Sequence, residues 1–251
     1  MSEAGDAFLG GRLRLVQPET GHRAGLDAVM LAAAARVLPG QRLLDVGSGC
    51  GVVGLSIAAR IADCTITGIE IDRSLCQLAV SNADRNSLSG RYRSINGDLM
   101  GPHTELAAAG LAPESFDIVV ANPPYYAQGR ATASHVQGRA RAAVMPPNGL
   151  DAWVRFMTAM AAPGGRLTVV YPATALGDLL SALDGRCGGL AVFPLFPRQG
   201  EPAHRIIVAG IKGSRAPLTL HAGLILHGPD NAFTPEAEAV LRHGEALQFG
   251  P

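Results

Sequence analysis

The stretch from Asn122 to Tyr125 reads Asn-Pro-Pro-Tyr and holds the side chains best suited to chemistry. It closes an apolar run, residues 116–121, whose β-branched residues predict a buried parallel strand. Because proline has no N–H and a fixed φ, the carbonyl oxygens of Asn122 and Pro123 stay outside any helix and remain free acceptors. With the Asn122 side-chain oxygen they suit a planar amino group that presents two N–H donors. Tyr125 adds a flat face, and the plainer interpretation is a Pro-Pro turn ending a strand.

A glycine-rich loop follows a predicted strand over 41–46 and leads into a predicted helix over 52–61. Its alternating glycines are Gly47, Gly49 and Gly51. They let the backbone pass close to a ligand, and the N–H groups at a helix N-terminus favour a carboxylate or phosphate. Residues 49–54 match the dinucleotide fingerprint Gly-x-Gly-x-x-Gly. A dinucleotide site places its first glycine at the strand-to-helix turn, whereas Asp45 and Gly47 come earlier here.

Acidic and amide side chains end four successive predicted strands. They are Asp45, Glu70, Asp98 and Asn122. The carboxyl ends of the strands in an open α/β sheet meet at one edge, where such folds bind ligands. A carboxylate at the tip of the second strand, the position of Glu70, can bind both hydroxyls of a ribose. We therefore expect an adenosine cofactor at this edge, although each of these residues alone could also serve as a helix cap or loop residue.

The order of predicted elements indicates an α/β fold with a doubly wound, Rossmann-like sheet. Mostly parallel strands are predicted over 41–46, 65–69, 92–95, 116–121 and 166–171, the last after a turn at 163–165. Helices are predicted over 27–37, 52–61, 73–88 with Asp72 as N-cap, 150–162 and 172–183, and a last helix after an N-cap at Thr234. Strands over 190–196, 205–211 and 218–227 have no helices between them, so the sheet must finish antiparallel.

The chain is expected to form one domain over 1–251, with an N-terminal hairpin and helix in 1–38 and a catalytic core in 39–251. Gly10 and Gly11 supply the turn of a short β-hairpin over 7–16, outside the main sheet.

Composition excludes several other classes of protein. At 251 residues and 47% apolar content the chain can bury a core without staples. The four cysteines lack metal-ligand spacing, which predicts reduced thiols, no zinc or other metal, and a cytoplasmic location. The N-terminus carries no apolar signal region, and no window reaches ~18 apolar residues, so no membrane segment is expected.

The net charge is zero, but the basic residues are unevenly placed. Residues 118–150 contain three arginines and no carboxylate, and residues 185–229 carry five basic residues against Glu201 alone. The three arginines are Arg130, Arg139 and Arg141, in a polar segment without clear periodicity. Such a segment can contact phosphates of a nucleic acid, or it can be a solvated loop.

Two motifs together resemble those of N-methyltransferases that use S-adenosylmethionine (SAM). The loop from Asp45 to Gly51 resembles methyltransferase motif I, and the Asn-Pro-Pro-Tyr stretch resembles the motif that holds a target –NH2 group. With residues 25–31 (Gly-Leu-Asp-Ala-Val-Met-Leu) and 228–230 (Gly-Pro-Asp), the whole chain is similar to the bacterial valine-tRNA adenine-N6 methyltransferases. These are small-domain class I enzymes that modify the adenine 3′ of the anticodon. The segment 128–148 departs most from that family.

The resemblance implies a role for each matching residue. SAM would lie with its methionine end on Gly47, Gly49 and Gly51, near Asp45, with its ribose on Glu70 and its adenine near Asp98. Asn122 and the Pro123 carbonyl would hold the adenine amino group, while Tyr125 stacks on the base. The partner would be tRNA, met in part by Arg130, Arg139 and Arg141.

Three rivals remain from the sequence. Glutamine-amide methyltransferases share the Asn-Pro-Pro-Tyr residues but carry a helical domain before motif I, where this chain has only some 40 residues. A small-molecule methyltransferase would not need the basic segments. A non-catalytic SAM-binding RNA assembly factor would not need an intact Asn-Pro-Pro-Tyr.

Overall fold

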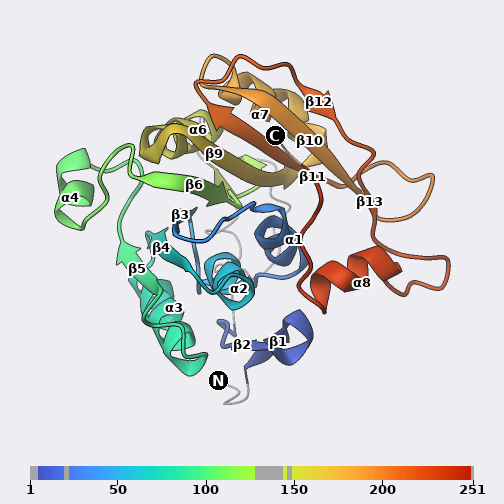
Figure 1. The fold of residues 1–251 in the computed structure, drawn as a ribbon, viewed down its shortest axis with the longest axis horizontal. Helices are drawn as coiled ribbons and strands as arrows, with labels where there is room; N and C mark the ends of the chain where they lie inside the picture. The colour runs from blue at the N-terminus through green and yellow to red at the C-terminus, as the bar shows by residue number, and fades with distance from the viewer. Residues whose placement is uncertain (1–4, 20–22, 128–143, 146–148, 250–251) are drawn as a thin grey trace.

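The computed structural model describes residues 5–19, 23–127, 144–145 and 149–249. At its centre lies a nine-stranded sheet (Figure 1) in the order β12-β10-β11-β9-β6-β3-β4-β5, with β13 paired to β10. The parallel strands are β3 (Gln41–Val46), β4 (Cys64–Glu70), β5 (Tyr92–Asn96), β6 (Phe116–Ala121) and β9 (Ala161–Pro172). The chain enters this sheet at β3, moves outward to β5 and then continues from β6 on the other side of β3. This is the predicted doubly wound arrangement.

The predicted antiparallel end of the sheet is confirmed for β11 but not for the last stretch of the chain in the sheet, which pairs parallel to β10. β11 (Arg205–Lys212) runs antiparallel to both neighbours, β9 and β10 (Cys187–Phe196). The single strand predicted over 218–227 is wrong, because the chain forms two short strands there, β12 (Thr219–Leu220) and β13 (Leu224–Ile225), parallel to β10. Gly223 lies between them with a φ of 81°, which departs from regular strand geometry.

Helices cover both faces of the sheet. On one face lie α1 (Leu26–Ala34), α2 (Val52–Arg60), α3 (Arg73–Arg85) and α8 (Pro235–Leu241). On the other lie α4 (His103–Ala108), α6 (Gly149–Met160) and α7 (Leu176–Leu183), preceded by the short helix η2 (Ala173–Ala175). Figure 1 shows α6 and α7 across the sheet from α1, α2 and α3. Leu43 and Ile118 belong to the first core, while Leu44 and Val119 belong to the second. Because both faces are covered, the central strand β6 appears in the sequence as a near-continuous apolar run.

Both predicted N-caps are confirmed. Asp72 accepts hydrogen bonds from the backbone N–H groups of Ser74 and Leu75, at 2.8 and 3.4 Å. Thr234 Oγ1 accepts one from Ala237 N at 3.2 Å, and Pro235 occupies the first turn of α8. Each cap satisfies N–H groups that have no partner within the helix.

The predicted N-terminal hairpin is also confirmed. β1 (Asp6–Phe8) and β2 (Leu13–Leu15) form a separate antiparallel sheet, joined through η1 (Leu9–Gly11). The pairing of Phe8 with Leu13 leaves four residues in the turn rather than the Gly-Gly pair alone. Leu9 shares the positive φ values of Gly10 and Gly11, at 51°, 66° and 90°.

Other details differ from the sequence predictions. α4 was not expected, and the turn expected at 163–165 lies inside β9, where a bulge against β6 absorbs it. Within the polar segment, β7 (Tyr126–Ala127) pairs with β8 (Val144–Met145). All four cysteines are free and buried, in keeping with reduced thiols. Among the described helices, none combines the length and apolar character that a membrane span requires.

Candidate active site

The glycine loop between β3 and α2 lies at the carboxyl edge of the sheet. Gly47, Gly49 and Gly51 all adopt positive φ values, at 69°, 55° and 89°, which an L residue adopts only at a cost. The carbonyl oxygen of Ile69, on β4, accepts hydrogen bonds from Gly47 N and Ser48 N at 2.9 and 3.0 Å. The loop is therefore tied to the neighbouring strand before any ligand binds.

One side of this loop is closed and the other is open. A Cβ added to Gly47 would lie 2.4 Å from the ring of Trp153, so α6 packs directly against the loop. A Cβ added to Gly49 would meet no atom within 4 Å. The open side at Gly49 is a place where a ligand can approach the backbone, next to the first turn of α2 and its N–H groups.

Asp45, the residue before the last of β3, lies beneath the loop. It is 1% exposed, and its Oδ2 accepts a hydrogen bond from Gly54 N in α2 at 3.0 Å. Burial raises the pKa of Asp45 to about 7, against the lowering effect of the Gly54 N–H, with a further raise from the charge of Glu70. The geometry gives Asp45 a direct part in holding the first turn of α2 against the strand.

Glu70 ends β4 and clamps the loop from the side. Its two carboxylate oxygens accept hydrogen bonds from Gly49 N and Asp72 N, both at 2.9 Å. Asp98, two residues beyond β5, is exposed and accepts a hydrogen bond from Met100 N at 2.8 Å. Both carboxylates retain lone pairs for further donors, because each oxygen can accept more than one hydrogen bond.

The Asn-Pro-Pro-Tyr stretch follows β6 at the same edge. Ala121 pairs with Val46, so Asn122 and Gly47 leave adjacent strands side by side. Asn122 and Tyr125 are partly buried, and the Tyr125 hydroxyl donates a hydrogen bond to Asn122 Oδ1. Burial, and next the charge of Asp27, raise the pKa of Tyr125 above its ordinary value, so the hydroxyl stays protonated at neutral pH.

Two residues that the sequence interpretation did not place in the site complete it. Asp27, in the first turn of α1, lies 3.1 Å from the Tyr125 hydroxyl through its Oδ2. Arg205, the first residue of β11, forms an ion pair with the same oxygen at 2.9 Å and lies over the Tyr125 ring at 4.9 Å. Burial works to lower the pKa of Arg205, and the hydrogen bond and charge of Asp27 outweigh it, so the pKa is raised. The pairs are 98 and 178 residues apart in the chain, so no local pattern could indicate them.

The structure thus brings most of the predicted site residues to one edge. The exceptions are Arg130, Arg139 and Arg141, which lie outside the described residues. Their predicted contact with phosphates stays a prediction.

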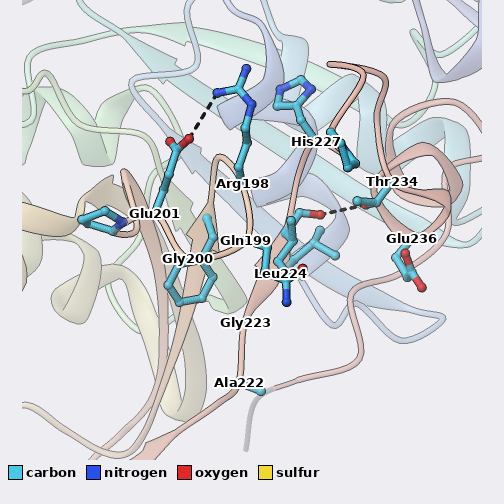
Figure 2. Close-up of a pocket in the computed structure, with 15 residues that line it drawn as sticks. Arg198, Gln199, Gly200, Glu201, Ala222, Gly223, Leu224, His227, Thr234 and Glu236 are labelled. Carbon is cyan, nitrogen blue, oxygen red and sulfur yellow. Dashed lines mark hydrogen bonds and ion pairs between the residues drawn. The ribbon is translucent and has the colours of Figure 1, made fainter.

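A large hollow lies elsewhere on the described surface, between the β10–β11 hairpin and the segment from β13 to α8 (Figure 2). It has a volume of about 1260 Å³ and is lined by apolar groups such as Leu224, with the Arg198–Glu201 ion pair on one side. None of the described site residues lines it. Size alone is a poor guide here, because the glycine loop and the strand tips carry the chemistry that a cofactor needs.

The residues of the glycine loop fit SAM. The open backbone at Gly49 and the helix N-terminus suit its methionine carboxylate, and Glu70 suits its ribose hydroxyls. With the strand order and the Asn-Pro-Pro-Tyr tip, fold and site define a class I SAM-dependent methyltransferase. Residues 26–145 match the family described as methyltransferase small domain, in keeping with this class.

Known relatives agree with that class. The chain is 28% identical over 212 residues to a tRNA1(Val) (adenine(37)-N6)-methyltransferase of Actinobacillus pleuropneumoniae, covering 83% of this chain and 84% of the relative. It is 29% identical over 178 residues to the enzyme of that name from Porphyromonas gingivalis, covering 69% and 68%.

Solved structures show the same fold. A structure from Agrobacterium tumefaciens, described as a predicted O-methyltransferase, is 29% identical with a TM-score of 0.74, covering 88% of this chain and 98% of that one. The tRNA (m1A58) methyltransferase of Aquifex aeolicus shares the fold at 14% identity and a TM-score of 0.55, covering 79% and 72%.

Proposed function

We propose that this enzyme transfers the methyl group of SAM to the N6 amino group of an adenine in tRNA. The observation that carries the proposal is the position of Asn122 and Tyr125, which lie at the tip of β6 beside the glycine loop of β3. Acceptors for an amino group and a binding loop for SAM then belong to one site. The names of the relatives from Actinobacillus and Porphyromonas support adenine in tRNA as the substrate.

In this proposal, the glycine loop, Glu70 and Asp98 hold the cofactor, and Asp45 acts from below by fixing Gly54 and the first turn of α2. SAM, when bound, supplies an electrophilic methyl group. Asp45 is buried, so we assign it an indirect part in cofactor binding.

The amino group of adenine is a poor nucleophile because its lone pair is conjugated with the ring. Asn122 Oδ1 and the Pro123 carbonyl accept its two N–H groups, which favours a more pyramidal nitrogen and disperses the positive charge that develops there. This stabilisation is realised mainly in the transition state, so it raises kcat more than it lowers KM. The proton released after transfer passes to solvent.

The target base must leave its stack to reach Asn122, at a cost of a few kcal/mol. Stacking on Tyr125, at about 1–3 kcal/mol per base, offsets much of that cost. Arg205 lies over the Tyr125 ring and covers one of its faces. The base therefore has at most the other face, unless Arg205 moves.

The experiment is methyl transfer from labelled SAM by the purified protein. We expect transfer to tRNA from a strain without the gene, and none to a glutamine-containing peptide or to free adenosine. Asn122→Ala should bind SAM as the wild type does and lose about 10²-fold or more in kcat, the scale for one lost transition-state hydrogen bond. A fully active Asn122→Ala variant would remove the amino-group site from the proposal.

A second candidate follows from the Agrobacterium structure, which is described as an O-methyltransferase. A hydroxyl acceptor presents one hydrogen, whereas Asn122 and Pro123 together offer two acceptor oxygens. The site therefore suits –NH2 better. Methyl groups recovered on ribose or on a small-molecule hydroxyl, and not on a base, would favour the second candidate.

A further inference from the structure

Four side chains form a continuous polar chain behind the tip of β6. The Tyr125 hydroxyl contacts Asn122 Oδ1 and lies 3.1 Å from Asp27 Oδ2. The same Asp27 oxygen accepts a hydrogen bond from Arg205 Nε at 2.9 Å. Three separate elements, the β6 tip, α1 and β11, therefore meet at this one carboxylate.

The Tyr125 hydroxyl has a single proton but two acceptor oxygens beside it, one on Asn122 and one on Asp27. It can donate that proton to only one of them at a time. A carboxylate is the stronger acceptor, because hydrogen bonds to charged groups are about twice as strong as neutral ones. When another donor reaches Asn122, the Tyr125 proton turns to Asp27 at little cost.

We propose that Asp27, anchored by Arg205, is a positioning residue that takes the Tyr125 proton and so keeps Asn122 Oδ1 available for the substrate amino group. The inference rests on the proposed function, because it assumes that Asn122 accepts that amino group. Without the Asp27 carboxylate, the Tyr125 hydroxyl loses its stronger acceptor, and it competes with the substrate amino group for Asn122 Oδ1.

Arg205 serves this arrangement in two ways. Its ion pair holds the Asp27 carboxylate in place, with side chains that are only 22% and 33% exposed for Asp27 and Arg205. Its guanidinium also lies over the Tyr125 ring, and Tyr171 makes an edge-on contact with that ring at 5.8 Å between centroids. Tyr125 is thus held from more than one side, which fixes where its hydroxyl points.

A purely structural role for Asp27 has to be separated from this one, because the Asp27–Arg205 pair also ties α1 to β11. Combining Asp27→Asn with Tyr125→Phe separates the two roles, because phenylalanine has no hydroxyl that could compete with the substrate for Asn122. Asp27→Asn keeps the size and one acceptor oxygen of the side chain and removes its charge. The matched control is Asp151→Asn. The Asp151 carboxylate, in α6, forms ion pairs with Arg155 of the same helix and with Arg186, which follows α7.

We expect Asp27→Asn to lower kcat about tenfold, with the SAM dissociation constant unchanged, and to cost less than about threefold further in the Tyr125→Phe background. Such a difference is within the range of coupling measured between residues in one hydrogen-bond network. Asp151→Asn should keep wild-type kcat. Equal losses from Asp27→Asn in both backgrounds would overturn the proposal in favour of a structural role.

The experiment also separates this proposal from the proposed function. A fully active Asp27→Asn beside a strongly impaired Asn122→Ala overturns the positioning role and leaves the proposed function standing. A fully active Asn122→Ala overturns both. If Asp27→Asn does not fold, Arg205→Gln replaces it in the same pair of backgrounds, with the same expectations, and melting temperatures identify which case applies.

Discussion

The ring of Trp153 lies so close to Gly47 that a Cβ at position 47 would approach it to 2.4 Å. The glycine loop is therefore wedged against α6 on one side, while Gly49 faces open space. The two glycines have the same backbone requirement, with φ of 69° and 55°, but opposite surroundings.

Replacing these two glycines should separate stability from cofactor binding. Gly47→Ala adds a clash with Trp153 to the strain of a positive φ. We therefore expect the free energy of unfolding to fall by several kcal/mol, at about 1–3 kcal/mol for each of the two effects, and the melting temperature to fall with it. Gly49→Ala carries only the strain, about 1–2 kcal/mol, but its methyl group would enter the open side that we propose as the cofactor site. It should weaken SAM binding at least tenfold in calorimetry. A Gly49→Ala variant that binds SAM normally would show that the open side is not the cofactor site.

Glu70 holds the loop through Gly49 N and, in the proposal, also binds the ribose. Glu70→Ala should weaken SAM binding by about 1.5–3 kcal/mol, the range for a charged hydrogen-bond partner. Glu70→Gln keeps an acceptor for Gly49 N and loses the charge, so its affinity for SAM should lie between those of the wild type and Glu70→Ala. Calorimetry with SAM measures both, and an unchanged affinity in Glu70→Ala would remove this residue from the site.

Asp45 should give the protein an unusual dependence on pH. Because burial raises the pKa of Asp45 to about 7, well above the ordinary value of an aspartate, the folded state holds this proton over a range where the unfolded state has lost it. Stability from this group therefore falls as pH rises from about 4 to 7. Asp45→Asn keeps an acceptor for Gly54 N, so its melting temperature should gain on the wild type by several degrees across that range. If the melting temperatures of the two proteins changed in parallel with pH across that range, the raised pKa of Asp45 would be refuted.

The three arginines of the polar segment test the contact with RNA. If Arg130, Arg139 and Arg141 meet phosphates, tRNA binding should weaken with salt by about 0.7–0.9 released counterions per contact. The triple Arg→Gln variant should show a smaller salt slope and a higher KM for tRNA, with unchanged SAM affinity. Unchanged kinetics on tRNA across a salt series would identify the segment as a solvated loop and reopen the small-molecule alternative.

The sequence predicts much of the fold because strands and helices alternate regularly from Gln41 to Ala121. Most of the buried strands are rich in apolar or β-branched residues and are bounded by glycine, proline, acidic or amide residues, and these signals are local. Where local signals are weak, prediction fails: α4 has only six residues, and the Pro-Gly-Gly at 163–165 is held within β9 by pairing with β6. For residues 163–165, pairing between segments distant in the sequence determines the structure, and the local turn signal does not.

The site shows the same division. Asp45, Glu70 and Asn122 could be predicted because each lies at or next to the end of a strand, and strand order places these ends together. Asp27 stood out only as part of a family-like segment, and Arg205 only as one of several basic residues. Their meeting at Tyr125 depends on α1 and β11 packing at the same edge, which no spacing in the sequence encodes.

The central claim is that the methyl group arrives on N6 of adenine in tRNA. The most direct measurement is mass spectrometry of nucleosides from unmodified tRNA incubated with the purified enzyme and deuterium-labelled SAM. We predict labelled N6-methyladenosine that depends on Asn122. Label on ribose, on another base or on no nucleoside at all would contradict the claim.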